Sequence, residues 1–208
     1  MTLKTHRGLI APLDRSNVDT DQIIPKQFLK SIARTGFGPQ LFYDWRYHAD
    51  GKPNPEFVLN QPRYRNASIL VARHNFGCGS SREHAVWAIV QDGFQAVVAS
   101  SFADIFRNNS FKNSLLTIEL SEPEVEEIFQ MVGRFAGLEA TVDVDEQRLT
   151  LHLAEEISFH FELEKSVKER LLHGLDDIGT SLKHEKEITA YEKTHHAQMR
   201  WQTHPPTP

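Results

Sequence analysis

Cysteine is almost absent from this chain, which has one, Cys78, among 208 residues. A single thiol excludes an internal disulfide framework and favours a reducing compartment. It also excludes a complete cysteine-ligated zinc or iron–sulfur site within the chain, because such a site needs about three or four thiolates or added histidines. We therefore expect this chain alone to hold no metal.

Long apolar runs and an excess of positive charge are also absent. No segment approaches the ~20 apolar residues that span a bilayer, and the N-terminal sequence MTLKTHRGLIAPLDRS lacks the apolar region of a signal peptide. The formal charge of -5 and the pI of about 6.1 argue against a nucleic-acid partner, which usually meets a basic face. We expect a cytoplasmic protein with neither a membrane nor a nucleic-acid partner.

The composition is that of a globular chain, with 39% hydrophobic and 25% charged residues. In the middle of the chain, short apolar segments alternate with helical patterns. The apolar segments are 68–72, 94–100 and 114–120, and the helical patterns are 81–93, 101–113 and 122–133. This alternation predicts an α/β unit with a partly parallel sheet.

The flanking regions differ from this α/β unit. Residues 6–13 predict a short strand closed by Pro12, and residues 27–34 one or two helical turns. Residues 36–66 show no clear periodicity and are interpreted as a long ordered loop. Three later segments alternate apolar and polar residues as half-buried antiparallel strands do: 140–147, 148–153 and 157–163. The last residues predict two helices broken near Gly179 and a frayed tail. The fold class is therefore α/β with a mixed sheet.

The sequence RHNFGCGSSREHA at residues 73–85 gathers several reactive groups. It follows a predicted strand and opens a predicted helix, so it lies where α/β proteins bind ligands. The first amides and the dipole of such a helix favour an anion. Gly77 and Gly79 permit close backbone approaches that a Cβ would forbid. The stretch therefore predicts an anion site.

Several alternatives compete for this stretch. It matches neither the phosphate-binding nor the dinucleotide-binding glycine pattern, and it lacks the glycine that a nucleophile elbow requires. Cys78 has no second cysteine to resolve it, which favours a turn residue over a redox thiol. Ser80 and Glu83 match a capping box, a purely structural role. Arg82 in the first helical turn would oppose the helix dipole, so a bound carboxylate explains it better and favours function.

Four segments together carry a resemblance to a known family: FGCGSSREHA, NVDTDQIIP, RTGFG and FADIFRNNSFKNSLL. They resemble the small subunits of bacterial 3-isopropylmalate dehydratases, which are swivel domains of the aconitase superfamily. The resemblance covers roughly residues 4–165. It implies a swivelling β/β/α domain, the aconitase C-terminal-like fold, over residues 1–165, followed by a helical extension and frayed tail over residues 166–208.

The resemblance also implies an activity. Such a chain is one half of a hydro-lyase and is active only with a large subunit that carries a 4Fe-4S cluster. The reaction isomerises 2-isopropylmalate to 3-isopropylmalate through isopropylmaleate in leucine biosynthesis, so the substrate is a small dicarboxylate. The alternatives are a small subunit of homoaconitase or of a citraconate or maleate hydratase, and a non-catalytic anion-binding module.

The superfamily motif implies roles for individual residues. Ser80 is the expected base, Arg82 supplies the positive charge that supports it, and Asp21 is the expected active-site aspartate. Asp19 competes with Asp21, and Asx-turn chemistry is the structural alternative for both. The expected substrate-binding residues are Ser81, Arg34 and Gly79. An apolar contact from Ile32, Phe37 or Leu41 is expected to select the substrate's isopropyl group, whereas His84 is expected to pack within its helix.

Overall fold

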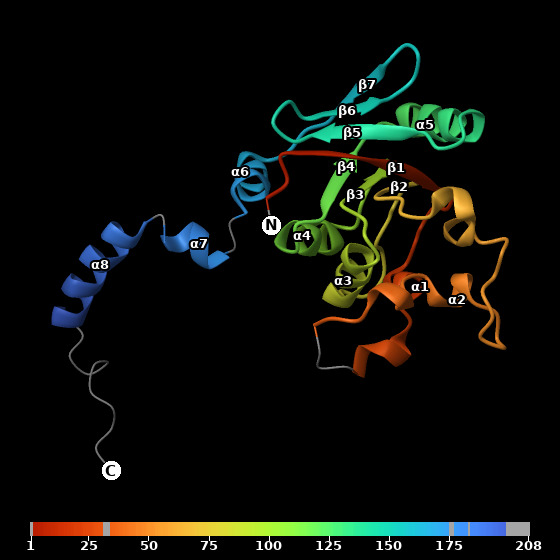
Figure 1. The fold of residues 1–208 in the computed structure, drawn as a ribbon. Coiled ribbons are helices and arrows are strands. Elements are labelled where there is room, and N and C mark those ends of the chain that lie inside the picture. Colours follow the sequence, from red (N-terminus) through yellow and green to blue (C-terminus); the bar gives the residue numbers. More distant parts are fainter. Residues whose placement is uncertain (1, 31–33, 175–176, 183, 199–208) are drawn as a thin grey trace. The chain divides into compact units, whose positions relative to one another are not determined.

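A computed structural model describes residues 2–30, 34–174, 177–182 and 184–198 (Figure 1). The chain divides into two compact units, Met1–Gly174 and Leu175–Pro208. All the site residues predicted from the sequence belong to the first unit. One of them, Ile32, is outside the described residues.

Among the described residues, the first unit is built on a seven-stranded sheet with the order β4-β3-β2-β1-β5-β6-β7. The strands are β1 (Thr5–Leu13), β2 (Ile69–Ala72), β3 (Ala96–Ala99), β4 (Leu116–Glu119), β5 (Glu139–Asp143), β6 (Arg148–Leu151) and β7 (Ile157–His160). Strands β1 to β4 pair in parallel, and β1, β5, β6 and β7 pair antiparallel. The expected mixed sheet is confirmed.

Strand β1 joins the two halves of the sheet. Its first part, from Thr5 to Leu9, pairs antiparallel with β5, and its second part, from Ile10 to Leu13, pairs in parallel with β2. The expectation that Pro12 closes this strand is wrong, because Pro12 lies inside the parallel register, opposite Val71. Strands β2 and β3 are buried along their whole length, whereas β5 and β6 alternate in burial. These patterns are typical of covered parallel strands and half-exposed antiparallel ones.

Three helices cover the parallel strands: α3 (Glu83–Gln91), α4 (Asp104–Lys112) and α5 (Glu122–Arg134). Helices α3 and α4 also connect consecutive parallel strands, whereas α5 leads from β4 to β5. Figure 1 shows α3 and α4 together on one side of these strands and α5 on the other. Helix α5 begins with a capping box between Ser121 and Glu124, and Pro123 occupies its first turn, as expected. The predicted alternation of strands and helices is confirmed.

The long loop is ordered by aromatic packing rather than by regular structure. It contains α2 (Tyr43–Arg46) and single 3-10 turns at Gly38–Gln40, Val58–Asn60 and Pro62–Tyr64. Phe42 is fully buried, stacks on Trp45 with 5.4 Å between ring centroids, and packs against Phe57 at 6.1 Å. Contacts of this kind carry no sequence period, which explains why the sequence predicted only a loop.

The first unit ends later than the sequence predicted. Helix α6 (Lys165–His173) packs on it through Leu171, whose side chain is buried and whose carbonyl accepts the N–H of Leu3 at 2.9 Å. Gly174 ends this helix in a left-handed conformation, a common helix terminator. The boundary between the units therefore follows residue 174, whereas the sequence had placed it after residue 165.

The second unit contains α7 (Asp177–Leu182) and α8 (Glu185–Gln198). The expected helix break near Gly179 is wrong, because Gly179 lies inside α7. The glycine that ends a helix in a left-handed conformation is Gly174, after α6. The expected frayed tail falls on residues 199–208, which lie outside the described part of the chain.

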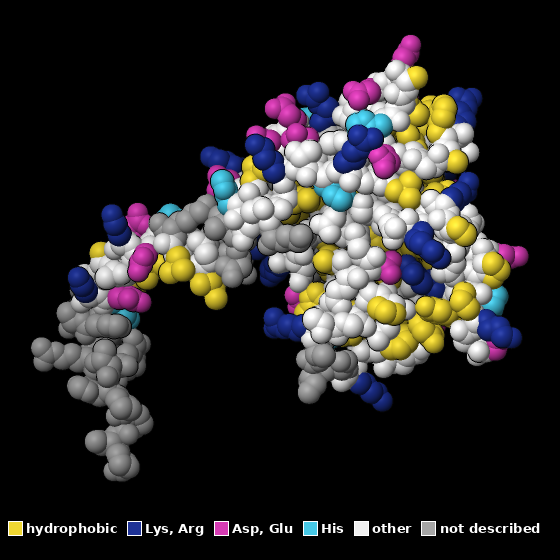
Figure 2. Space-filling view, in the orientation of Figure 1, with side chains coloured by type: hydrophobic (Ala, Val, Ile, Leu, Met, Phe, Trp, Pro, Cys, Tyr) yellow, Lys and Arg dark blue, Asp and Glu magenta, His cyan; other side chains and the backbone are white. Residues whose placement is uncertain are grey.

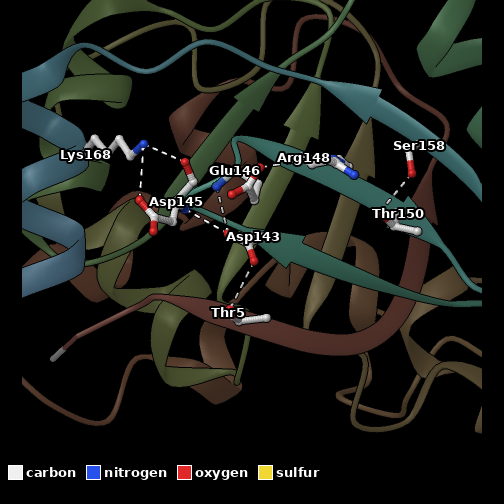
Figure 3. A network of polar contacts seen from close by, with 8 residues as sticks. All are labelled: Thr5, Asp143, Asp145, Glu146, Arg148, Thr150, Ser158 and Lys168. Atoms are coloured by element: carbon white, nitrogen blue, oxygen red, sulfur yellow. Dashed lines mark hydrogen bonds and ion pairs between the residues drawn. The ribbon is translucent and has the colours of Figure 1, made fainter.

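The antiparallel half carries a polar network around the turn between β5 and β6 (Figure 3). Asp143 accepts the N–H groups of Asp145 and Glu146, each at 2.9 Å, and the hydroxyl of Thr5 at 3.4 Å. Lys168 of α6 pairs with the Asp145 carboxylate at 3.4 Å. Charged side chains of both signs cover this part of the surface (Figure 2). The network is structural, since it closes a tight turn and attaches α6 to it.

A search of the described helices finds none that combines the length and the apolar character needed to cross a membrane.

Candidate active site

The segments that follow β1 and β2 run side by side at the carboxyl ends of these strands. Asp19 and Cys78 form a parallel bridge. The N–H of Gly77 donates to the Val18 carbonyl at 2.8 Å, and the N–H of Thr20 donates to the Cys78 carbonyl at 2.9 Å. This pairing holds the glycine-rich turn at the sheet edge where open α/β sheets bind ligands.

The two glycines of the turn are required by its geometry. Gly77 has φ 77°, and a Cβ there would lie 2.2 Å from the Phe106 ring. Gly79 has φ 86°, and its Cβ would lie 2.0 Å from a carboxylate oxygen of Asp19. Both positions therefore exclude a side chain on conformational and on steric grounds. Gly79 in particular lets the serine turn lie against the start of α1 (Thr20–Ile23).

The structure separates the roles of the two aspartates. Asp19 is the N-cap of α1, because its carboxylate accepts the N–H of Asp21 at 2.6 Å and its own N–H donates to the Gln22 side chain at 2.9 Å. The structural alternative therefore accounts for Asp19. The Asp21 side chain takes no part in this cap and points to Arg82 instead.

Arg82 forms a hydrogen-bonded ion pair with Asp21. The Arg82 side chain is only 10% exposed, and that of Asp21 is 36% exposed. A nearly buried guanidinium needs a counter-ion, and a carboxylate is the best match for its fork of donors. Lys26 lies 3.7 Å from the other carboxylate oxygen of Asp21. The structure thus brings together two of the three expected catalytic residues.

Ser80 and Ser81 line a small pocket beside this ion pair. The pocket has a volume of about 220 Å³. Its lining residues are Thr20, Gly77, Gly79, Ser80, Ser81, Arg82, Ala103, Asp104, Ile105 and Phe106. Both serines are exposed, and the Ser80 carbonyl accepts the buried hydroxyl of Thr20 at 2.7 Å. The backbone of Ser80 is thereby fixed at the pocket wall.

Helix α3 begins later than the capping-box prediction required. Its N-cap is Arg82, in an extended conformation and without a side-chain cap bond, so the predicted box between Ser80 and Glu83 is wrong. Glu83 instead accepts from the Asn113 side chain at 3.0 Å. Arg82 consequently precedes the first helical turn, and the carboxylate of Asp21 balances its positive charge. The serines are free of any capping role in α3.

The Arg34 segment lies against the other end of α3. The Arg34 guanidinium lies 5.9 Å from the centroid of the Trp87 ring, and its carbonyl accepts from Gln91 at 2.8 Å. Phe37 and Leu41 are buried in the core, with 1% and 0% exposure. Ile32 lies outside the described residues. Contact of any of these three with the isopropyl group stays a prediction.

His84 packs as expected. Its ring meets Phe37 edge-on at 5.2 Å and Trp87 at 4.7 Å between centroids.

Cys78 has the properties of a turn residue. Burial raises the pKa of its thiol, and the charge of Asp19 raises the pKa further. A protonated thiol is a poor metal ligand and a poor nucleophile. No group of three or more histidine, cysteine or acidic side chains among the described residues could hold a metal ion. The residues present therefore do not fit an iron–sulfur cluster.

We expect the Cys78 thiol to react slowly with iodoacetamide at pH 7, several-fold more slowly than glutathione, and to speed up steeply as the pH rises. The reason is that the raised pKa keeps the thiolate fraction low until more alkaline pH. Mass spectrometry of the intact chain gives the rate. Cys78→Ala, assembled with the large subunit, should retain most of the hydro-lyase activity that the family resemblance implies. Rapid labelling at pH 7 with loss of activity would show that the thiol is functional.

Thr20 and Ile105 are among the pocket residues that sequence reasoning missed. Thr20 is 2% exposed and holds the serine turn, but in the sequence it is one polar residue of a polar loop. Ile105 is 55% exposed and lines the pocket wall. Its signal was an apolar side chain in the first turn of α4, next to the acidic residue Asp104. Neither signal is specific without the fold.

A larger cavity, of about 740 Å³, is not the site with the chemistry. Its lining includes Arg15, Trp45 and Arg73. Arg73 is paired with Asp14 at 2.6 Å and with Glu126, and Arg15 lies 4.4 Å from the centroid of the Trp45 ring. Its cations already have partners within the chain, so we assign it no role.

A mixed sheet that carries the turn from Gly77 to Arg82 at the carboxyl end of the parallel strand β2 is the arrangement of a swivel domain of the aconitase superfamily. The family model of the aconitase C-terminal domain matches residues 1–123. A second model, which describes the C-terminal domain of 3-isopropylmalate dehydratase small subunits, matches residues 177–203.

Individual proteins narrow this class. A 3-isopropylmalate dehydratase small subunit from Desulforapulum autotrophicum (strain HRM2) is 56% identical over 198 residues, which cover 90% of this chain and 92% of that protein. A crystal structure of 3-isopropylmalate dehydratase from Methanocaldococcus jannaschii DSM2661 matches with a TM-score of 0.63 and 26% identity, over 90% of this chain and 99% of that one. The chain belongs to the family of 3-isopropylmalate dehydratase small subunits.

Proposed function

We propose that this chain is the small subunit of a hydro-lyase that interconverts 2-isopropylmalate and 3-isopropylmalate through isopropylmaleate in leucine biosynthesis. The observation that carries the proposal is the joint placement of Ser80, Ser81 and Arg82 on one pocket, with Asp21 paired to the arginine. In a chain of this family, that arrangement supports proton transfer next to a bound carboxylate.

Ser80 is the proposed base. The reaction removes a proton from a carbon next to a carboxylate and a hydroxyl from the adjacent carbon, and water then adds back in the other orientation. A serine can take such a proton only as an alkoxide, so a positive charge must offset the cost of ionising it. Arg82 is two residues away and nearly buried, where water screens its charge little. The isomerisation is complete when Ser80 returns the proton to the carbon that lost the hydroxyl and the hydroxyl of water adds to the carbon that lost the proton.

The substrate's carboxylates are the proposed ligands of Ser81, the Gly79 backbone and Arg34. Gly79 allows the chain to approach an anion closely because it has no Cβ. Asp21 orients Arg82 and balances its charge before substrate binds. An incoming carboxylate then competes with Asp21 for the same guanidinium. Arg34, an exposed cation on the segment that lies against α3, is the proposed ligand of the second carboxylate.

The partner is a large subunit, as the family of small subunits implies. We propose that it carries the 4Fe-4S cluster, which would supply a Lewis acid for the departing hydroxyl, since the described residues here offer no ligand set for it. Ile105, an exposed apolar side chain on the wall of the pocket, is a suitable contact for a partner that closes over the site. A cytoplasmic location, favoured by the single cysteine, stays a prediction.

The test is reconstitution. The purified chain is mixed anaerobically with its cognate large subunit, and hydration of isopropylmaleate is followed by loss of its ultraviolet absorbance. We expect turnover in the mixture and none with either chain alone. If a tight complex hydrates citraconate or maleate but not isopropylmaleate, the proposed substrate is wrong and the hydrated diacid takes its place. A complex without turnover on any of these diacids would favour a non-catalytic anion-binding module.

A further inference from the structure

The side chain of Gln91 bonds to both ends of the Arg34–Phe37 segment. Its amide oxygen accepts the N–H of Phe37 at 2.8 Å, and its amide nitrogen donates to the carbonyl of Arg34 at 2.8 Å. An amide is the side chain that can serve a donor and an acceptor at once in this way. One residue at the end of α3 therefore closes the segment that carries Arg34.

Close packing supports these two bonds. A Cβ on Gly38 would lie 2.6 Å from the Gln91 carbonyl oxygen, so the chain after Phe37 rests directly on the end of α3. The Phe37 ring contacts His84 at 5.2 Å and Trp87 at 5.8 Å between centroids. The segment thus lies along α3, from its last residue toward its first turn.

Helix α3 links this segment to the serine turn. Its N-cap is Arg82, which lines the pocket, and its last residue is Gln91, which binds the Arg34 segment. A helix of this length is rigid, because its backbone hydrogen bonds and its buried face hold it as one body. The position of Gln91 therefore sets where Arg34 lies with respect to Arg82 and Ser80.

We propose that Gln91 is a positioning residue for substrate selection. In this role it touches neither the substrate nor the reacting atoms. It holds the Arg34 segment so that Arg34 binds one carboxylate from a fixed position, and this sets the orientation of the rest of the substrate, including the group that distinguishes isopropylmalate from smaller diacids. The proposal rests on the function proposed above, and it adds a residue that lies outside every motif of the family resemblance.

Two substitutions at Gln91 disrupt its two hydrogen bonds to different extents. Gln91→Leu removes both bonds. Gln91→Glu keeps an acceptor for the Phe37 N–H and turns the other contact into a repulsion with the Arg34 carbonyl. Gln130→Leu is the matched control, because Gln130 is also an exposed helical glutamine, and its side chain bonds Glu126, on its own helix, at 3.3 Å.

In the assembled enzyme we expect Gln91→Leu to raise KM for isopropylmaleate about tenfold with kcat within about twofold, as loss of uniform substrate binding requires. The ratio of kcat/KM for isopropylmaleate to that for citraconate should fall several-fold. Gln91→Glu should show a smaller change, and Gln130→Leu none. Unchanged kinetics in Gln91→Leu, or a fall in kcat at constant KM, would overturn the proposal.

Amide hydrogen exchange of the full chain gives a readout that does not depend on turnover. We expect the Phe37 amide to exchange at least several-fold faster in Gln91→Leu and to remain protected in Gln130→Leu. Equal protection in both variants would refute the positioning role even if the wild-type enzyme is active. Faster exchange combined with a wild-type assembly inactive on isopropylmaleate would refute the proposed substrate, and with it the selection that Gln91 is proposed to serve.

Discussion

Replacing Ser80 by alanine should reduce turnover of the assembled enzyme by at least about a hundredfold, the range that general-base catalysis contributes. The loss should appear in kcat, because the hydroxyl acts in proton transfer and adds little to binding in the ground state. Stability should hardly change, since the Ser80 side chain is exposed and the bond from Thr20 reaches its carbonyl, which alanine keeps. Steady-state hydration of isopropylmaleate, with thermal unfolding as a second measurement, checks both expectations.

Ser158→Ala is the matched control for Ser80→Ala. Ser158 is an exposed serine in β7 whose hydroxyl bonds that of Thr150 at 3.0 Å, on the antiparallel half of the sheet (Figure 3). We expect its activity and its stability to stay near those of the unmodified chain. Retention of more than a tenth of the activity by Ser80→Ala, in a complex that forms normally, would remove Ser80 from the role of base.

Arg82→Lys should lower kcat/KM about a hundredfold despite keeping the charge. Lysine has one compact ammonium in place of a planar fork, so it cannot hold Asp21 and a substrate carboxylate in the same geometry. The Arg82 side chain is only 10% exposed. Because lysine has fewer donors than arginine, the substitution also leaves part of the hydrogen-bonding capacity of this nearly buried site unsatisfied. We expect the melting temperature to fall by a few degrees, equivalent to about 1 kcal/mol. Kinetics and a thermal melt on the same preparation measure both effects.

Arg107→Lys is the control for this substitution. Arg107 is on α4 and pairs with Glu119 at 3.2 Å, with 33% of its side chain exposed. A partly exposed pair of this kind contributes little, so we expect near-normal activity and stability. If Arg82→Lys behaves like Arg107→Lys, the arginine fork has no special part in the site and the pairing with Asp21 is merely structural.

The parts of the fold that the sequence predicted are those with a local periodic signal. Continuous apolar runs identified β2 and β3, and alternation identified β5 and β6. Signals without a period failed at the edges of elements. The start of α3 was misplaced because Ser80 and Glu83 have cap-like spacing, although a bond from Thr20, which is 60 residues distant, holds Ser80 in the turn.

The candidate site divides in the same way. The serine turn is contiguous in the sequence, so its residues could be named together from the motif. Asp21 and Arg82 come from segments that only the sheet brings together, and their pairing is visible only in the fold. The residues predicted to set specificity illustrate the limit, because Phe37 and Leu41 were chosen as apolar loop residues and are buried in the core.

By itself, the sequence determined the fold class, the family resemblance and the short turn that holds the proposed chemistry, because strand and helix periods and a contiguous motif are local properties. Only the tertiary structure decided that Asp19 is a cap while Asp21 pairs with Arg82, that Ile105 lies on the pocket wall, and that Gln91 binds the Arg34 segment. The physical reason is that these contacts join residues far apart in the chain, and packing rather than local propensity selects them.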